Sequence, residues 1–160
     1  MRKNQTLIVI LVLAVLTFAA YWRILGNGFI KYDDDDYVYA NTHIQHGITP
    51  QSLKWAFNVG YACNWHPLTW ISHMVDYSVF GAKPMGHHLI SLLLHMLNAV
   101  LLLLVLRRLT SRLGSTQAGS LWKSAFVAAL FALHPLHVES VAWAAERKDV
   151  LSATFWFLTM

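Results

Sequence analysis

Two long runs of apolar residues limit what this chain can fold into. The first extends from Thr6 to Leu25 and the second from Leu89 to Leu106, and neither contains an acidic residue. A helix of about 20 residues, with a rise of 1.5 Å per residue, crosses a hydrocarbon core that is roughly 30 Å thick. Hydrophobic residues make up 56% of the sequence and charged residues only 12%, whereas soluble domains carry about 25% charged residues. The chain is therefore expected to be a helical membrane protein.

Two shorter apolar segments follow. Ala125–Leu133 is interrupted by His134 and Pro135, and Pro135 is expected to bend or end the helix because it lacks a backbone donor. Another run begins near Val150 and reaches Met160. We therefore expect an all-α, polytopic transmembrane protein with spans at about 6–25, 88–107, 122–138 and 149–160 onward, and an outer loop at 27–87. We also expect the chain to be the N-terminal part of a longer protein.

The first apolar run has a second interpretation, as a cleaved signal peptide. Met1–Gln5 resembles the basic start of such a peptide, and Leu7–Ala20 resembles its apolar centre. A clear cleavage pattern is missing and the apolar character continues to Trp22, which favours a membrane span. Within the outer loop, the segments 50–58 and 67–80 mix polar and apolar residues and are expected to be short helices at the membrane interface, where Trp and Tyr are favoured.

Charge predicts the orientation of the spans. The N-terminus and the loop after the second run contain basic residues and no Asp or Glu; these residues are Arg2, Lys3, Arg107, Arg108, Arg112 and Lys123. By the positive-inside rule both segments are cytoplasmic, so the outer loop and the region from His134 to Lys148 face outward. The net charge of +4 comes largely from these basic segments, and it indicates topology rather than nucleic-acid binding.

A run of four aspartates, Asp33–Asp36, follows the first span directly. Unpaired carboxylates cannot stay in hydrocarbon, so the run marks the point at which the chain enters water. Such runs are usually solvated surface. Here, however, aromatic and apolar neighbours and mutual repulsion are expected to raise the carboxylate pKa values, which suits a general base. The same carboxylates could bind a divalent cation, and the sequence leaves that requirement open.

The string HPLHVESVAWAAERKDVL holds the remaining candidates, which we assign to donor-phosphate binding: His134, His137, Glu139, Arg147 and Lys148. Arg147 and Lys148 are expected at the outer membrane boundary, where they can bind a lipid-linked phosphate or simply snorkel. If the segment after Pro135 is one helix, His137, Val141 and Ala144 share a face, and Glu139, Trp143 and Glu146 share another. The zinc pattern H-E-x-x-H is absent, so a metallopeptidase is disfavoured.

Three strings together resemble a known family. They are FIKYDDDDYVYAN, NWHPLTWISHMVDYSVFGAKPMGHHLISLLLHMLN and FVAALFALHPLHVESVAWAAERKDVLSATFWFL. They are similar to the N-terminal part of GT-C membrane glycosyltransferases that carry C-terminal tetratricopeptide repeats and are related to protein O-mannosyltransferases. The paired strings HPLHVES and ERKDVL are the most specific part of the match. The resemblance covers nearly the whole chain from Gly28 onward.

This resemblance implies an inverting transfer of a sugar from a polyprenyl-phosphate donor to a hydroxyl, on a protein or another acceptor. It also implies that an aspartate just after the first span is the base, and that position falls on Asp33 and Asp34. The setting would be a multi-pass protein of a bacterial inner membrane with a cytoplasmic N-terminus. The later spans and the repeats of the family are not in this sequence, so the chain alone is expected to be inactive.

Two other functions remain open from the sequence. A transporter could use Asp and His groups to line a cation path, but within the apolar runs only His95 and the region near His134 supply such groups. A non-catalytic membrane scaffold that presents repeats to partners would share the spans without the chemistry.

Overall fold

The computed structural model describes residues 2–58, 60–113 and 116–160, and over these ranges it contains helices and no strand. The α-helices are α1 (Arg2–Tyr21), α2 (Thr42–Gln45), α3 (Pro50–Ala56), α4 (Pro67–Phe80), α5 (Pro84–Arg112), α6 (Gln117–Leu133), α7 (Val138–Ala142) and α8 (Arg147–Leu158). Short helical turns at 22–26, 35–39, 61–63, 135–137 and 144–146 connect them. The expected all-α class is confirmed.

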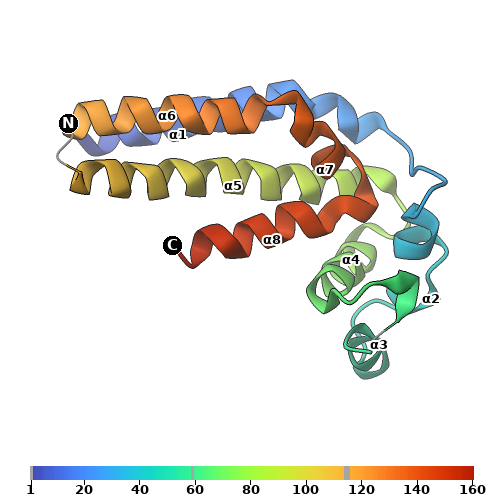
Figure 1. Ribbon diagram of the computed structural model, residues 1–160. Coiled ribbons are helices and arrows are strands. Elements are labelled where there is room, and N and C mark those ends of the chain that lie inside the picture. The colour runs from blue at the N-terminus through green and yellow to red at the C-terminus, as the bar shows by residue number, and fades with distance from the viewer. Residues whose placement is uncertain (1, 59, 114–115) are drawn as a thin grey trace.

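The long helices form a bundle with a separate region at one end (Figure 1). Helices α1, α5 and α6 run side by side, and α8 packs along α5. The segment 27–83, which contains α2, α3 and α4, lies at one end of the bundle, and we refer to it as the cap region. The N-terminus, the last turns of α5 and the start of α6 lie at the opposite end, which we call the basic end after Arg107, Arg108, Arg112 and Lys123.

Among the described residues, two helices are long and apolar enough to cross a membrane, Asn4–Gly26 and Pro84–Arg112. A third crossing is counted if Ala118–Leu133 and Pro135–Ala142 form one span, and these two pieces are bent by 51°. The bend expected at Pro135 is confirmed. Helix α8, where the fourth span was expected to begin, has 12 residues.

Small side chains allow the bundle helices to approach one another closely. Ala99 from α5 and Ala128 and Ala132 from α6 are buried against Leu13 and Leu103. Lipid is as apolar as these side chains, so association in a membrane depends on such close packing and on interhelical hydrogen bonds. The alanines place α5 at the centre of the bundle, in contact with α1, α6 and α8.

Side chains from two other helices satisfy carbonyl groups at the break after α6. The Nε2 atom of His95 donates to the Ala132 carbonyl at 3.0 Å, and the Tyr21 hydroxyl donates to the His134 carbonyl at 3.4 Å. The last carbonyls of a helix have no partner within it, and Pro135 cannot continue the ladder. The bend is therefore held by α1 and α5 together.

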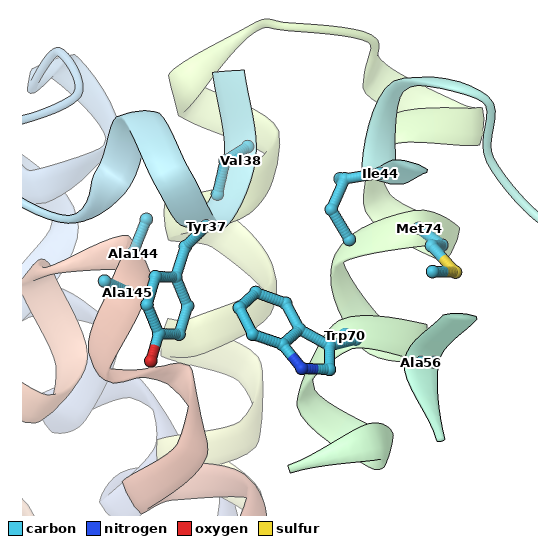
Figure 2. Packing of buried hydrophobic residues seen from close by; sticks show 8 residues of the cluster. All are labelled: Tyr37, Val38, Ile44, Ala56, Trp70, Met74, Ala144 and Ala145. Atoms are coloured by element: carbon cyan, nitrogen blue, oxygen red, sulfur yellow. The ribbon is translucent and has the colours of Figure 1, made fainter. Parts of the chain in front are cut away.

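The cap region has its own apolar core, built around Trp70 of α4 (Figure 2). The buried members of this core are Tyr37, Val38, Ile44, Ala56, Trp70, Met74, Ala144 and Ala145. The helices expected at 50–58 and 67–80 are confirmed as α3 and α4, and each begins at a proline, as is common at the first helical position. Because Ala144 and Ala145 belong to the same core, the segment before α8 is fixed to the cap region.

The segment from Pro135 to Leu158 is not one helix. Trp143 has an extended backbone, with φ −95° and ψ 122°, and it separates α7 from the turn that leads into α8. The helical faces expected to group His137 with Ala144, and Glu139 with Glu146, therefore do not form. The break instead turns residues 144–148 toward the cap region.

Candidate functional site

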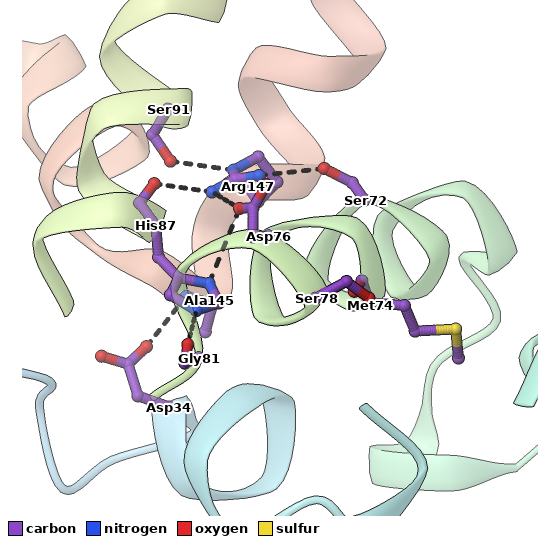
Figure 3. Close-up of polar contacts among 10 residues, drawn as sticks. All are labelled: Asp34, Ser72, Met74, Asp76, Ser78, Gly81, His87, Ser91, Ala145 and Arg147. Carbon is purple, nitrogen blue, oxygen red and sulfur yellow. Dashed lines mark hydrogen bonds and ion pairs between the residues drawn. The ribbon is translucent and has the colours of Figure 1, made fainter. Parts of the chain in front are cut away.

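Neighbouring aspartates of the acidic run have different environments. Asp33 is exposed, and its φ of +69° places it in the left-handed region, which Asp adopts more readily than most residues. Asp34 is fully buried. Its Oδ2 atom accepts from the Ile30 amide at 2.8 Å. Its Oδ1 atom accepts from the Ala145 amide at 2.9 Å (Figure 3). Burial raises the pKa of Asp34, and these two amides oppose the rise.

Asp34 thus joins segments that are 111 residues apart in the sequence. A buried amide that loses its acceptor carries a desolvation cost of about 1–3 kcal/mol. Asp34 prevents that cost at the buried Ala145 amide and holds the 144–146 turn against the cap region. Asp33, by contrast, has a carboxylate that faces solvent and is available to a substrate.

A π-helical turn, Asp35–Tyr39, follows the buried aspartate and directs Tyr37 and Val38 inward. The Tyr37 ring packs on Trp70 at a centroid distance of 4.6 Å and stacks on His66 at 5.5 Å. Its hydroxyl accepts from Asn64 Nδ2 at 3.1 Å. Short π-helical turns occur frequently at functional sites.

Charged groups from the acidic run and from the start of α8 act on the Tyr37 hydroxyl. Burial raises the pKa of Tyr37; Lys148 lowers it, and Asp33 and Glu146 raise it. Lys148 Nζ lies 5.9 Å from the centre of the Tyr37 ring and 2.5 Å from Glu146 Oε1. The structure therefore gathers an exposed carboxylate, a phenol and an ion pair at the cap end of α8.

His66 completes this group. Burial lowers the pKa of His66, and the positive charge of Lys148 lowers it further. The ring is consequently neutral at pH 7, and its Nε2 atom has no hydrogen-bond partner among the described residues. His66 precedes α4 directly, and Pro67 fixes the start of that helix.

A groove of about 770 Å³ runs between the start of α4 and the first turns of α8. Its polar lining residues are His66, Thr69, Lys148, Asp149 and Ser152. Its other walls are aromatic and aliphatic: Phe57, Trp65, Pro67, Leu68, Leu151 and Phe155. Trp65 and Phe57 are exposed, whereas Trp55, Tyr61 and Trp70 pack on one another inside the cap region. The arrangement can accept a molecule with an anionic head and an apolar chain.

Arg147 lies inside the protein, unlike the next residue, Lys148. Its guanidinium is fully buried and donates to Ser91, Ser72 and the His87 carbonyl at 2.9, 2.9 and 2.6 Å (Figure 3). The same group pairs with Asp76 at 2.8 Å. A phosphate could reach it only if these contacts were broken. Arg147 therefore locks the start of α8 to α4 and α5, and this fixes the position of Lys148.

Buried histidines surround that ion pair. In the part of the chain that the structure describes, His73, Asp76 and His87 form the only group with the spacing of metal ligands. Both ring nitrogens of His73 lack a partner there. Arg147 already supplies the positive charge next to the Asp76 carboxylate, and a divalent cation would add an uncompensated buried charge. The donor set therefore fits a buried ion-pair network better than a metal centre.

The other candidates from the sequence lie on a different segment. His134 and Glu139 are exposed, and His137 packs against His95 and Phe131 at ring distances of 5.5 and 4.5 Å. Within the described ranges, no hydrogen bond, ion pair or ring contact joins His134, His137 or Glu139 to Asp33 or Lys148.

Sequence reasoning assigned no role to His66 or Asp76. Asp76 lies in the outer loop, as a single acid in a helix whose other members are apolar or neutral. A lone carboxylate of this kind indicates a buried partner, and Arg147 is that partner. No comparable signal in the sequence singles out His66.

Comparison with known proteins identifies similar chains. The sequence is 34% identical to protein O-mannosyl-transferase Tmtc1 of Drosophila melanogaster over 154 residues, which cover 91% of this chain and 17% of that protein. It is 32% identical to protein O-mannosyl-transferase Tmtc2 of the same fly over 153 residues, which cover 90% of this chain and 15% of Tmtc2. It is 29% identical to human protein O-mannosyl-transferase TMTC3 over 157 residues, which cover 91% of this chain and 16% of TMTC3.

The chain thus spans less than a fifth of the length of these relatives, as the coverage of 17% in Tmtc1 indicates. No family model matches the chain, and no solved structure matches it at a significant level.

Proposed function

This chain is a distant homologue of the Tmtc protein O-mannosyl-transferases, and we propose that it forms part of a membrane glycosyltransferase that moves a sugar from a polyprenyl-phosphate donor to an acceptor hydroxyl. The observation that carries the proposal is that Asp33 and the Glu146–Lys148 pair act on the same Tyr37 hydroxyl, while Lys148 also lines the apolar groove. The names of the relatives favour mannose as the sugar and a protein as the acceptor.

In the proposed reaction, Asp33 takes the proton of the acceptor hydroxyl. The acceptor oxygen then attacks the anomeric carbon, and the bond from that carbon to the phosphate oxygen breaks with inversion. The electron pair leaves with the polyprenyl phosphate, and Lys148 stabilises the developing negative charge. The apolar walls of the groove, which include Leu68 and Phe155, would hold the first part of the polyprenyl chain.

Asp33 is preferred to Asp34 because a general base must reach the proton that it removes. Asp34 is fully buried with both oxygens engaged, so it serves the site by holding the 144–146 turn. Likewise Lys148 keeps the phosphate-binding role, and Arg147 becomes a positioning residue. His134, His137 and Glu139 are not part of this proposal.

Donor binding can be measured on the chain itself. We expect Lys148→Gln, in lipid nanodiscs, to weaken binding of a polyprenyl phosphate about tenfold, which corresponds to roughly 1.4 kcal/mol. Lys83→Gln removes the same charge from an exposed site outside the groove and should leave binding unchanged. Equal affinities of wild type and Lys148→Gln for the polyprenyl phosphate would show that the groove does not bind the donor. The non-catalytic scaffold would then be the better explanation.

Transfer is measured with the complete protein. Asp33→Asn should lower kcat by about 10²–10⁴-fold, the usual contribution of a general base. Asp36→Asn, which changes an exposed neighbour in the same way, should lower it far less. Normal transfer by Asp33→Asn would show that the base lies elsewhere.

We also propose that the cap region faces outward and the basic end faces the cytoplasm. The two segments at the basic end hold six of the twelve Lys and Arg residues and no acid, which is the pattern of cytoplasmic segments. The exposed Cys63 provides a natural label in the cap region. An impermeant thiol reagent should label Cys63 in intact cells and should not label Ser111→Cys in a Cys63→Ser background. The opposite labelling pattern would invert the topology.

A further inference from the structure

A second cleft lies at the basic end, far from the site described above. It has a volume of about 640 Å³ and lies between the last turns of α5 and the end of α8. Leu101, Leu104 and Leu158 contribute apolar walls, and Arg107, Arg108 and Ser111 contribute polar groups. One edge of the cleft can therefore contact an anion while its walls contact hydrocarbon.

The positive charge at this end lies apart from the acidic residues of the chain. Among the residues that the structure describes, none of the cationic side chains Arg107, Arg108, Arg112 and Lys123 forms an ion pair. Every acid of the sequence lies elsewhere, at 33–36, 76, 139, 146 and 149. Arg107 is half-buried beside the cleft, and none of the described acidic side chains pairs with it.

We infer that this cleft binds one anionic phospholipid. Its phosphate would contact Arg107 and Arg108, since guanidinium groups bind phosphate oxygens through paired hydrogen bonds. An acyl chain would lie along Leu101 and Leu104. Basic pockets between membrane helices recognise anionic lipid headgroups in this way.

The shape of the cleft separates this inference from simple snorkelling. Arginines that only reach the headgroup level would attract anionic lipids diffusely, with no fixed number bound. A cleft with apolar walls predicts one retained lipid per chain and a requirement for both the charge and the space. A protein segment in the cleft would satisfy the apolar walls but would need its own acids to satisfy the arginines.

Native mass spectrometry of the purified chain tests the inference with phosphatidylglycerol and phosphatidylcholine of identical acyl chains. We expect one phosphatidylglycerol per chain, bound about tenfold more tightly than phosphatidylcholine. The double variant Arg107→Gln/Arg108→Gln should lose that preference. The matched control Lys54→Gln/Lys83→Gln, which removes two exposed charges from the cap region, should keep it.

A space-filling variant tests the cleft itself. Leu104→Trp keeps every charge and should reduce retention of phosphatidylglycerol at least fivefold, and Val105→Trp serves the same purpose if Leu104→Trp does not fold. If both tryptophan variants retain the lipid, binding in the cleft is wrong and diffuse surface charge explains the preference. The absence of any preference in the wild-type chain, or its persistence in the arginine variant, would overturn the inference altogether.

Discussion

The cap region and the bundle both bury polar side chains, but they use different chemistry. Near the cap region the buried polar groups include charged ones, namely Asp34 with its two amides and Asp76 with Arg147, beside neutral ones such as Asn41 and Ser52. Among the described residues farther along the bundle the buried polar groups are neutral. Asn98 donates to the Val150 carbonyl at 2.8 Å and accepts from Thr154 at 2.7 Å, which joins α5 to α8.

This difference follows from the surroundings of each region. A neutral amide or hydroxyl in hydrocarbon needs only a partner dipole, whereas a charge there costs several kcal/mol. At the membrane boundary a charge can be buried if a partner and hydrogen bonds compensate it. Charged groups thus lie where catalysis would need them, and neutral groups hold the spans together.

The largest effect is expected from the buried ion pair. Asp76→Asn leaves the Arg147 charge uncompensated and should destabilise the fold by about 3–5 kcal/mol. Lys148→Gln, one residue along, should change stability by less than about 1 kcal/mol because its ion pair is only partly buried. Unfolding in mixed SDS micelles measures both values. A double substitution, Asp76→Leu with Arg147→Met, should recover much of the lost stability. Equal destabilisation by Asp76→Asn and Lys148→Gln would show that the ion pairs of Arg147 and Lys148 do not differ in their contribution to stability.

The next effect separates the two aspartates of the proposed site. Asp34→Ala leaves the Ile30 and Ala145 amides without acceptors and should destabilise the protein by about 2 kcal/mol. Asp33→Asn should leave the unfolding midpoint nearly unchanged, because Asp33 is exposed and Asn also tolerates its left-handed backbone. The same unfolding assay compares them. A stable Asp34→Ala variant would contradict the role of Asp34 as the link to the 144–146 turn.

A smaller effect is expected in the bundle. Asn98→Ala removes two interhelical hydrogen bonds and should cost about 1 kcal/mol, because interhelical bonds in membranes contribute modestly. Leu97→Ala, an exposed neighbour on the same helix, is the control for helix propensity and lost apolar area. A loss for Asn98→Ala as large as that for Asp76→Asn would contradict the contrast between neutral and charged burial.

The smallest effect concerns pH and His73. Burial lowers the pKa of His73 well below its ordinary value, and the charge of Arg147 contributes. The unfolded chain binds a proton at this ring as the pH falls through about 6.5, whereas the folded chain does not, so stability is lost as the pH decreases. Between pH 7 and pH 6 this loss should be about 0.7 kcal/mol. His73→Gln should reduce the pH dependence by that amount, whereas His46→Gln, an exposed histidine, should not.

Local patterns in the sequence predicted much of the fold. The apolar runs correspond to α1 and α5, Pro135 predicted the bend after α6, and Pro67 marks the observed start of α4. These features depend on hydropathy and on the missing donor of proline, and both act over a few residues. The sequence also placed Asp33, Asp34, Arg147 and Lys148 in two segments that the structure brings to one end of the bundle.

Only the tertiary structure decided which member of each neighbouring pair is buried. Asp33 and Asp34 are chemically identical, and the left-handed turn at Asp33 together with the distant Ala145 amide separates their environments. Arg147 and Lys148 differ in the same way, because the break at Trp143 turns Arg147 toward Asp76. Hydropathy and charge are properties of single residues and their near neighbours, so the sequence determined the spans and the charged ends. Burial depends on contacts between segments that are far apart in the chain, and only the folded structure determines those contacts.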